Sequence, residues 1–156
     1  MRVSAKVDYA VRASVELAAA QAGDDPNRPV KAEALARAQE IPVKFLANIL
    51  QGLRQADIVY SRRGPDGGHL LARPAAEISL ADVIRAIDGP LAGVSGRRPE
   101  DVEFRGTAAP LQAVWIALRA SVRRVLQEVS LADVASGQVP QHVSELTGDP
   151  GACKKR

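Results

Sequence analysis

The sequence predicts a mainly α-helical chain with one small β-hairpin, followed by a long amphipathic helix. Three observations support this fold class. Apolar residues recur at helical spacing within residues 4–22 and 43–55. Between residues 58 and 72, two short apolar runs flank a turn that is rich in glycine. Across residues 108–131, apolar side chains recur at alternating intervals of four and three.

Length and composition limit the architecture further. The 156 residues suffice for one domain, or for one small domain with an added oligomerisation element. Hydrophobic residues make up 46% of the chain but aromatic residues only 3%, so small aliphatic side chains must fill the core. The formal net charge of +3 gives weak support for a nucleic-acid partner. The positions of the basic residues are more informative, because they concentrate at the start of the chain, around residues 54–63 and within residues 119–124.

The first helix is predicted at residues 4–22, where Ser4 can act as the N-cap. After a loop, residues 31–39 favour a short helix, and Pro42 suits the first turn of the next helix, at residues 43–55. The apolar stripe of that helix comprises Phe45, Leu46, Ile49, Leu50 and Leu53. Its opposite face presents Lys44, Ala47, Asn48, Gln51 and Arg54. A short helix, a tight turn and a second amphipathic helix form the helix-turn-helix arrangement.

A basic hairpin follows this motif. The apolar runs at residues 58–60 and 70–72 can pair as antiparallel strands, because the residues between them favour a tight turn. Those turn residues include Gly64, Pro65, Gly67 and Gly68. Arg62 and Arg63 then lie where the hairpin projects from the body. The helix-turn-helix and the hairpin together predict a winged helix-turn-helix DNA-binding domain over residues 1–90; the alternative is a surface hairpin whose arginines contact only water.

The remaining chain is predicted to form a connecting loop and a helix through which two chains dimerise. Ser79 and Asp82 resemble a capping box for a helix that ends at Asp88-Gly89-Pro90, and residues 91–107 form a connecting loop. Residues 108–134 form the dimerisation element, whose helix spans 108–131. Its seam comprises Leu111, Trp115, Leu118, Val122, Val125 and Val129. Packing against a twofold mate is favoured over a helix of the chain's own core, because so small a domain cannot cover this stripe. Residues 135–156 are polar and predict a disordered tail.

Four blocks of sequence together resemble the Rrf2 family of bacterial winged-helix regulators, of the IscR, NsrR and CymR type. They are Met1-Arg2-Val3-Ser4-Ala5-Lys6-x-x-Tyr9-Ala10-Val11-Arg12-Ala13; Ile41-Pro42-Val43-Lys44-Phe45-Leu46 with Leu50-x-x-Leu53-Arg54; Arg63-Gly64-Pro65-x-Gly67-Gly68-x-x-Leu71-Ala72-Arg73-Pro74; and Ile78-Ser79-Leu80-Ala81-Asp82-Val83-Ile84-Arg85-Ala86-Ile87-Asp88-Gly89-Pro90. The resemblance covers residues 1–134. It implies a homodimeric repressor or activator with one helix-turn-helix per protomer in the major groove.

Residue chemistry assigns separate roles within this DNA-binding surface. Asn48 and Gln51 carry both donors and acceptors, so they can read base edges. Lys44 and Arg54 flank them and can neutralise phosphates. Arg63, with Arg62 beside it, can enter a narrow minor groove. Further phosphate contacts are predicted for Arg2, Lys6 and Tyr9, although Tyr9 fits a helix-packing role equally well.

The sequence departs from the family in its metal ligands. Many members carry three cysteines after the Asp-Gly-Pro element, and those thiolates hold an iron–sulfur cluster. Here residues 91–110 contain neither cysteine nor histidine. Asp8 lies at a position where some members supply a carboxylate ligand, but one carboxylate cannot hold a cluster alone. We therefore expect no cofactor. A signal would enter through a small ligand or a protein partner, in the space between loop 91–107 and the dimer helices.

Catalysis and membrane insertion find no support in the sequence. His69 and His142 have no plausible aspartate or cysteine partner nearby, and Cys153, the single cysteine, lies in a basic tail that offers no base. No stretch has the roughly 18 apolar residues of a membrane span, and no signal peptide is visible. We expect a cytoplasmic protein that is not an enzyme. The alternative function is a winged-helix interaction module that docks an enzyme or another acidic partner.

Overall fold

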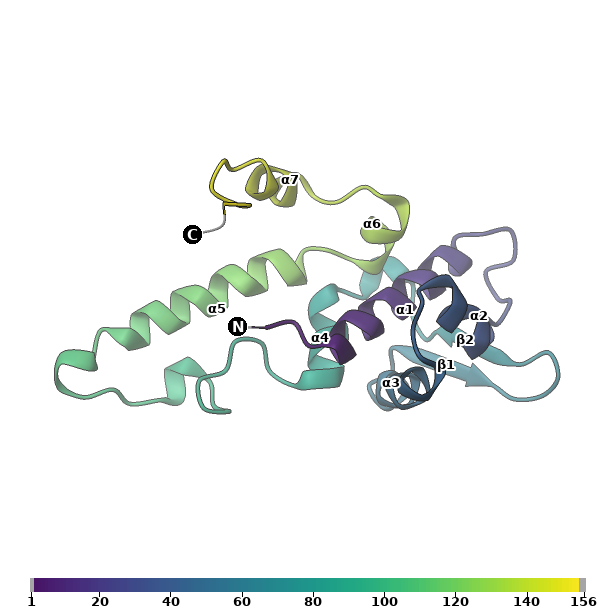
Figure 1. Ribbon diagram of the computed structural model, residues 1–156, viewed down its shortest axis with the longest axis horizontal. Helices are drawn as coiled ribbons and strands as arrows, with labels where there is room; N and C mark the ends of the chain where they lie inside the picture. The colour runs from purple at the N-terminus through teal and green to yellow at the C-terminus, as the bar shows by residue number, and fades with distance from the viewer. Residues whose placement is uncertain (1, 155–156) are drawn as a thin grey trace.

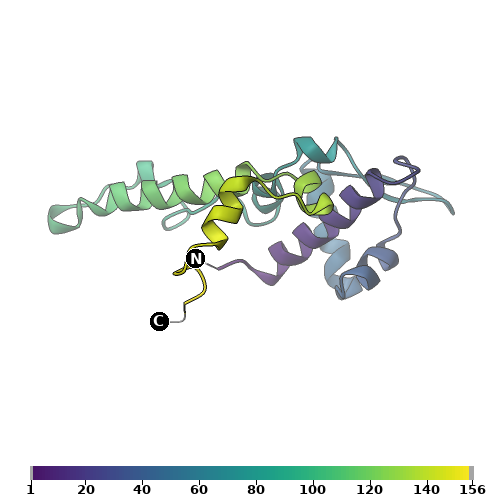
Figure 2. The same ribbon diagram turned by 90° about the horizontal axis from the view of Figure 1, so that it is seen from above.

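The computed structural model describes residues 2–154; Met1, Lys155 and Arg156, which belong to the predicted domain and tail, lie outside the described residues. The molecule is elongated (Figure 1, Figure 2). Helices α1 to α4, α6 and a two-stranded hairpin form a body at one end, and α5 projects away from it. The predicted fold class, mainly helical with a small β-hairpin, is confirmed.

Helix α1 (Ala5–Gln21) is the central element of the body. Ser4 caps it as predicted, since its hydroxyl accepts a hydrogen bond from the Val7 amide at 3.1 Å. The buried face of α1 is mostly small, and it packs against α3, α4 and α6. Ala10 and Ala13 are both 0% exposed. Side chains of this size let helices approach closely, which suits a chain so poor in aromatic residues.

The helix-turn-helix consists of α2 (Ala32–Ala38) and α3 (Val43–Gln55). Four residues of the predicted apolar stripe are buried: Leu46, Ile49, Leu50 and Leu53. The fifth is a correction, because Phe45 is 58% exposed. One residue before Leu46, it points about 100° around the helix from the buried stripe. Its ring instead meets Tyr9 edge to face, with the ring centroids 6.5 Å apart.

The hairpin pairs β1 (Val59–Arg62) with β2 (Gly68–Leu71), so both strands reach closer to the turn than the apolar runs indicated. Arg62 lies opposite Gly68. A third segment extends the sheet: Val30 and His69 exchange two backbone hydrogen bonds, at 2.9 and 2.8 Å. Gly68 allows this approach, because a Cβ there would lie 2.6 Å from the Val30 carbonyl oxygen. The sequence showed no sign of this pairing.

After the hairpin and the short turn η1 (Ala75–Glu77), α4 (Leu80–Asp88) begins with the predicted capping box. Ser79 accepts from the Asp82 amide at 3.1 Å, and the Asp82 carboxylate accepts from the Ser79 amide at 3.0 Å. Gly89 ends the helix with a φ of +80°. The segment between α4 and α5 contains two short 3-10 turns, η2 (Pro99–Asp101) and η3 (Gly106–Ala108).

Helix α5 (Leu111–Gln127) is shorter than predicted at both ends. Pro110 occupies its N-cap position. At the other end the chain leaves the helix to bond with residues at the start of α4: the Leu80 amide donates to Val129 and the Leu131 amide donates to Ile78, both at 2.9 Å. These long-range bonds replace the helical ones. Val129 consequently lies beyond the helix and is 3% exposed, which corrects its placement on the seam.

Two short helices complete the chain. Ser130 and Asp133 form a second capping box at the start of α6 (Leu131–Ser136), which packs on α1. The predicted disordered tail contains α7 (Gln141–Thr147), so the tail prediction is wrong for these residues. Pro140 precedes the helix, and Gln141 donates to Glu145 one turn later at 2.8 Å. Local hydrogen bonds of this kind stabilise a helix even though none of its residues is buried.

Candidate nucleic-acid interface

The polar face of α3 is held outward by the packing of its opposite face. Leu46, Ile49 and Leu53 are each 0% exposed and anchor the helix to the body. Their burial leaves no freedom for α3 to rotate without exposing the core. The four predicted DNA-contacting residues of this helix are all exposed: Lys44, Asn48, Gln51 and Arg54. The structure thus brings two amide side chains and two cations together on one face.

The start of α1 lies beside the start of α3. Arg2 and Lys6 are exposed there, as phosphate contacts require. Tyr9 is half-buried and contacts Phe45. Its ring also lies under Arg12, whose guanidinium carbon is 5.0 Å from the ring centroid. Tyr9 therefore has a helix-packing role in this structure.

Arg12 was not among the functional residues predicted from the sequence. Its guanidinium donates to the Gln39 carbonyl oxygen at 2.8 Å and forms an ion pair with Asp8 at 3.1 Å. It thereby ties α1 to the turn between α2 and α3, on which the orientation of α3 depends. The spacing of Asp8, Tyr9 and Arg12 places all three on one side of a helix, which was the available signal.

The wing carries the two predicted arginines. Arg62 ends β1 and Arg63 begins the turn, and both side chains are exposed. At the base of the wing, the Ser61 hydroxyl and Nδ1 of His69 lie 2.9 Å apart across the two strands. Burial lowers the pKa of His69, and the nearby charge of Arg54 lowers this pKa further, whereas Glu33 acts in the opposite direction. Helix α3 packs against β1, so the end of α3 and the base of the wing are neighbours.

The predicted dimer seam is largely uncovered within the described part of the chain. Helix α5 contributes no buried residue. Leu111 is 40% exposed and Leu118 39%, while Trp115, Val122 and Val125 are half-buried. The exposed Val114 and Ile116 add to the apolar surface of this helix. Trp115 and Leu118 also line a cavity of about 270 Å³ with residues 92–94 of the connecting loop.

The donor atoms of the chain do not fit an iron–sulfur cluster. Within residues 2–154, no group of three or more cysteine, histidine or acidic side chains is arranged to hold a metal ion. Cys153 is exposed near the C-terminus, far along the chain from loop 91–107. Within the same residues, no helix is long and apolar enough to cross a membrane.

Comparison with known proteins places this architecture in a family. Residues 3–137 match the Rrf2 family, which is described as iron-dependent transcriptional regulators. A Mycobacterium tuberculosis protein, Rv1287, whose name assigns it to the HTH-type transcriptional regulators, is 52% identical over 149 residues, covering 96% of this chain and 90% of the relative. The HTH-type transcriptional regulator IscR of Cereibacter sphaeroides is 31% identical, covering 89% of this chain and 90% of the relative.

A solved structure agrees with the sequence relatives. CymR, the global cysteine regulator of Bacillus subtilis, superposes with a TM-score of 0.73 at 28% identity, covering 88% of this chain and 98% of CymR. The family match spans the helix-turn-helix, the wing and α5, which are the elements that form the surface described above. The chain therefore belongs to the Rrf2 family and is a winged-helix transcriptional regulator.

Proposed function

We propose that this regulator binds a pseudo-palindromic DNA operator as a homodimer and represses transcription there. The observation that carries the proposal is the exposed polar face of α3, which a buried apolar stripe holds rigidly beside a basic wing. In helix-turn-helix proteins such a face enters the major groove. A protein that occupies an operator in this way excludes other proteins from the same DNA.

Each side chain of the surface has a role that follows from its chemistry. Asn48 and Gln51 read base edges, because an amide can donate and accept at once. Lys44 and Arg54 contact phosphates on either side of the groove, together with Arg2 and Lys6. Arg62 and Arg63 reach the minor groove from the wing. Tyr9, which is half-buried against Phe45, is the remaining candidate for a phosphate contact.

A second copy of the chain covers α5 in this proposal. Exposed apolar residues on a projecting helix are costly in water, and two such helices packed together remove both stripes from solvent. The proposed interface comprises Leu111, Trp115, Leu118, Val122 and Val125. A twofold dimer presents two copies of α3, which fit half-sites roughly 34–36 Å apart.

The proposed regulator works without an iron–sulfur cluster. Residues 91–110 offer no thiolate or imidazole, and one exposed cysteine cannot replace three. Protein purified without oxygen should be colourless and contain no stoichiometric iron. Iron analysis and visible absorption spectra of anaerobic and aerobic preparations provide the test; about two or more iron atoms per protomer would contradict it.

Genome-wide mapping of the bound sites, followed by gel shifts on the fragments recovered, tests the function directly. Specific fragments should bind more tightly than unrelated duplexes by roughly 10³-fold or more. Their affinity should fall steeply as salt rises from roughly 50 to 200 mM. Reporter expression from the same fragments should rise when the protein is deleted. Equal affinity for all duplexes, or none, would instead favour a protein-interaction module.

A further inference from the structure

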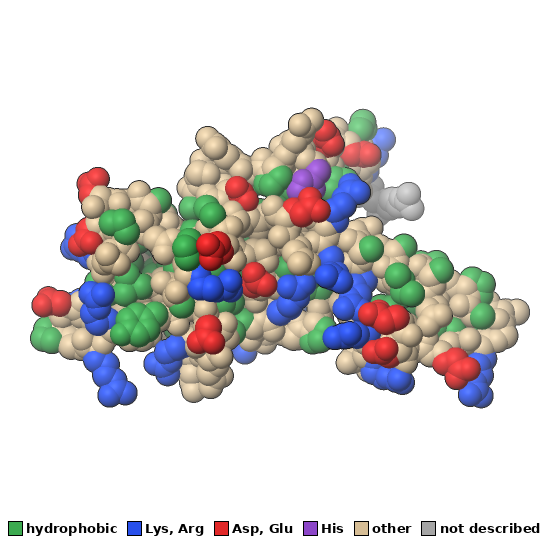
Figure 3. Space-filling view, turned by 180° about the vertical axis from the view of Figure 1, so that it is seen from behind, with side chains coloured by type: hydrophobic (Ala, Val, Ile, Leu, Met, Phe, Trp, Pro, Cys, Tyr) green, Lys and Arg blue, Asp and Glu red, His purple; other side chains and the backbone are tan. Residues whose placement is uncertain are grey.

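Four arginines line one cavity at the junction between the body and α5. The cavity has a volume of about 290 Å³, and Gly89, Pro90 and Leu91 complete its wall. Its arginines come from three separate segments of the chain: Arg85 from α4, Arg98 from the connecting loop, and Arg119 and Arg123 from α5. Figure 3 shows basic side chains gathered at this junction, with acidic ones beside them.

The carboxylates near the cavity balance only part of this charge. Asp82 pairs with Arg85 at 3.3 Å, and Glu100 pairs with Arg119 at 2.7 Å. A backbone hydrogen bond lowers the pKa of Glu100, as do Arg119 and the charge of Arg98, so this carboxylate is ionised at neutral pH. Across residues 2–154, neither Arg98 nor Arg123 has a carboxylate oxygen within 4.0 Å. The four arginines of the cavity therefore outnumber the two carboxylates that pair with them by two.

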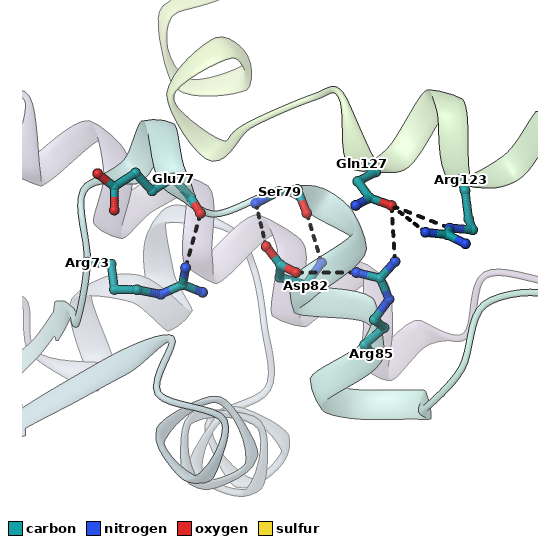
Figure 4. Close-up of polar contacts among 7 residues, drawn as sticks. All are labelled: Arg73, Glu77, Ser79, Asp82, Arg85, Arg123 and Gln127. Atoms are coloured by element: carbon teal, nitrogen blue, oxygen red, sulfur yellow. Dashed lines mark hydrogen bonds and ion pairs between the residues drawn. The ribbon is translucent and has the colours of Figure 1, made fainter.

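The hydrogen bonds of the cluster are also incomplete. Arg85 and Arg123 both point at one neutral acceptor, the Oε1 atom of Gln127, and each contact measures 3.4 Å (Figure 4). This exceeds the usual 2.7–3.2 Å of an N–H···O bond. In addition, Nε of Arg119 is buried and has no hydrogen-bond partner in the described structure. Three arginines of the cavity thus carry donor atoms that have either a long contact or no partner.

We propose that this arginine pocket, comprising Arg85, Arg98, Arg119 and Arg123, binds a small multivalent oxyanion. Phosphate, sulfate and carboxylate groups accept two parallel hydrogen bonds from a guanidinium, which is the geometry that arginine favours. An anion of charge −2 or −3 matches the excess of the pocket. Its volume equals that of roughly ten water molecules, which admits inorganic phosphate or a short polycarboxylate such as citrate.

The position of the pocket gives such a ligand a regulatory role, an extension that rests on the proposed DNA binding and dimerisation. The pocket joins α4 to α5. Helix α4 packs against α3, where a Cβ on Gly52 would lie 3.4 Å from the Ile87 side chain. An anion held by arginines of both α4 and α5 would fix the dimer helix relative to the reading helix. It would thereby set the spacing of the two copies of α3 in the dimer.

Isothermal titration with inorganic phosphate and with citrate, at constant chloride and without DNA, tests the site. The double variant Arg98→Gln/Arg123→Gln should weaken binding of the better ligand roughly tenfold or more, because two charged hydrogen-bond donors are lost. Arg105→Gln/Arg124→Gln is the matched control, since it removes the same charge at two exposed positions outside the pocket. This control should bind within about twofold of the parent. Thermal unfolding in chloride establishes that both variants are folded.

The remaining outcomes separate this site from the DNA surface. The proposal would be overturned if the parent chain bound neither anion. It would also be overturned if the two double variants lost anion affinity equally. Unchanged anion binding in the pocket variant would overturn it as well. If the pocket variant instead loses affinity for duplex DNA and its salt slope drops by roughly two phosphate equivalents, the arginines contact the DNA backbone. Anion binding without any DNA binding would contradict the proposed function and leave the pocket in place.

Discussion

Helices α3 and α5 are both amphipathic, yet only α3 buries its apolar stripe. α3 is surrounded by α1, α2, α4 and β1, and three of its leucine and isoleucine side chains are 0% exposed. Within residues 2–154, the main contacts of α5 are with α4 and η2, and none of its residues is buried. The same periodic signal thus leads to two outcomes. An apolar stripe specifies that a helix has a partner, but not whether the partner belongs to the same chain.

Charged substitutions on the α5 stripe test this comparison most strongly. Leu118→Asp/Val122→Asp should yield folded monomers, because two carboxylates cannot be buried unpaired against a second helix. Operator affinity should fall by roughly 10²–10⁴-fold, since the two reading helices no longer act together. Light scattering and gel shifts provide the measurements. Ala113→Asp/Ala120→Asp, on the exposed opposite face of α5, should remain dimeric. A parent chain that is monomeric at micromolar concentration would contradict the dimer.

Truncation of the buried stripe should affect folding rather than assembly. Ile49→Ala should lower the free energy of unfolding by about 2–5 kcal/mol, because it leaves a cavity among fully buried side chains. In the monomeric variant Leu118→Asp/Val122→Asp, the further change Val114→Ala should lower the free energy of unfolding far less, because the Val114 side chain is 55% exposed. Urea denaturation followed by circular dichroism measures both. Equal losses would mean that α5 is part of the core of its own chain.

Two substitutions separate the roles within the DNA surface. Asn48→Ala should relax the base preference at one position per half-site, at a cost of about 1–3 kcal/mol. Arg63→Ala should instead weaken binding to all sequences alike, with the salt slope reduced by about one phosphate equivalent if its role is mainly electrostatic. Binding to a library of operator variants at several salt concentrations distinguishes the two effects. Unchanged affinity in both variants would show that α3 and the wing do not contact DNA.

The smallest expected effect concerns the pH dependence of the wing. The pKa of His69 in the folded chain is lowered from its ordinary value of 6.5. As the pH falls below 6.5, His69 therefore binds fewer protons in the folded chain than in the unfolded chain. The contribution of His69 to the stability of the fold should therefore be fully present above pH 6.5. It should be lost as the pH falls through the pKa of His69 in the folded chain. His69→Gln should flatten this decline in thermal unfolding, whereas His142→Gln, outside the wing, should keep it. A steeper decline in His69→Gln would contradict the assignment.

Several elements were predictable because local chemistry determines them. The Ser4 cap and the Ser79–Asp82 capping box depend on residues three positions apart, so the sequence alone indicates where α1 and α4 begin. The glycine-rich turn likewise places Arg63 at the tip of a hairpin. The exposed face of α3 followed from the period of its apolar residues, and with it the candidate DNA contacts.

Other features depend on contacts between distant parts of the chain, and only the tertiary structure decided them. Val129 left the predicted seam because hydrogen bonds to residues near α4 end the helix at Gln127. Phe45 points about 100° around α3 from the buried stripe, and its contact with Tyr9 of α1 is a tertiary one. The arginine pocket joins residues up to 38 positions apart, from Arg85 to Arg123, that no motif connects. Sequence periodicity determined which residues form each helix, whereas the way the helices meet determined what each surface can bind.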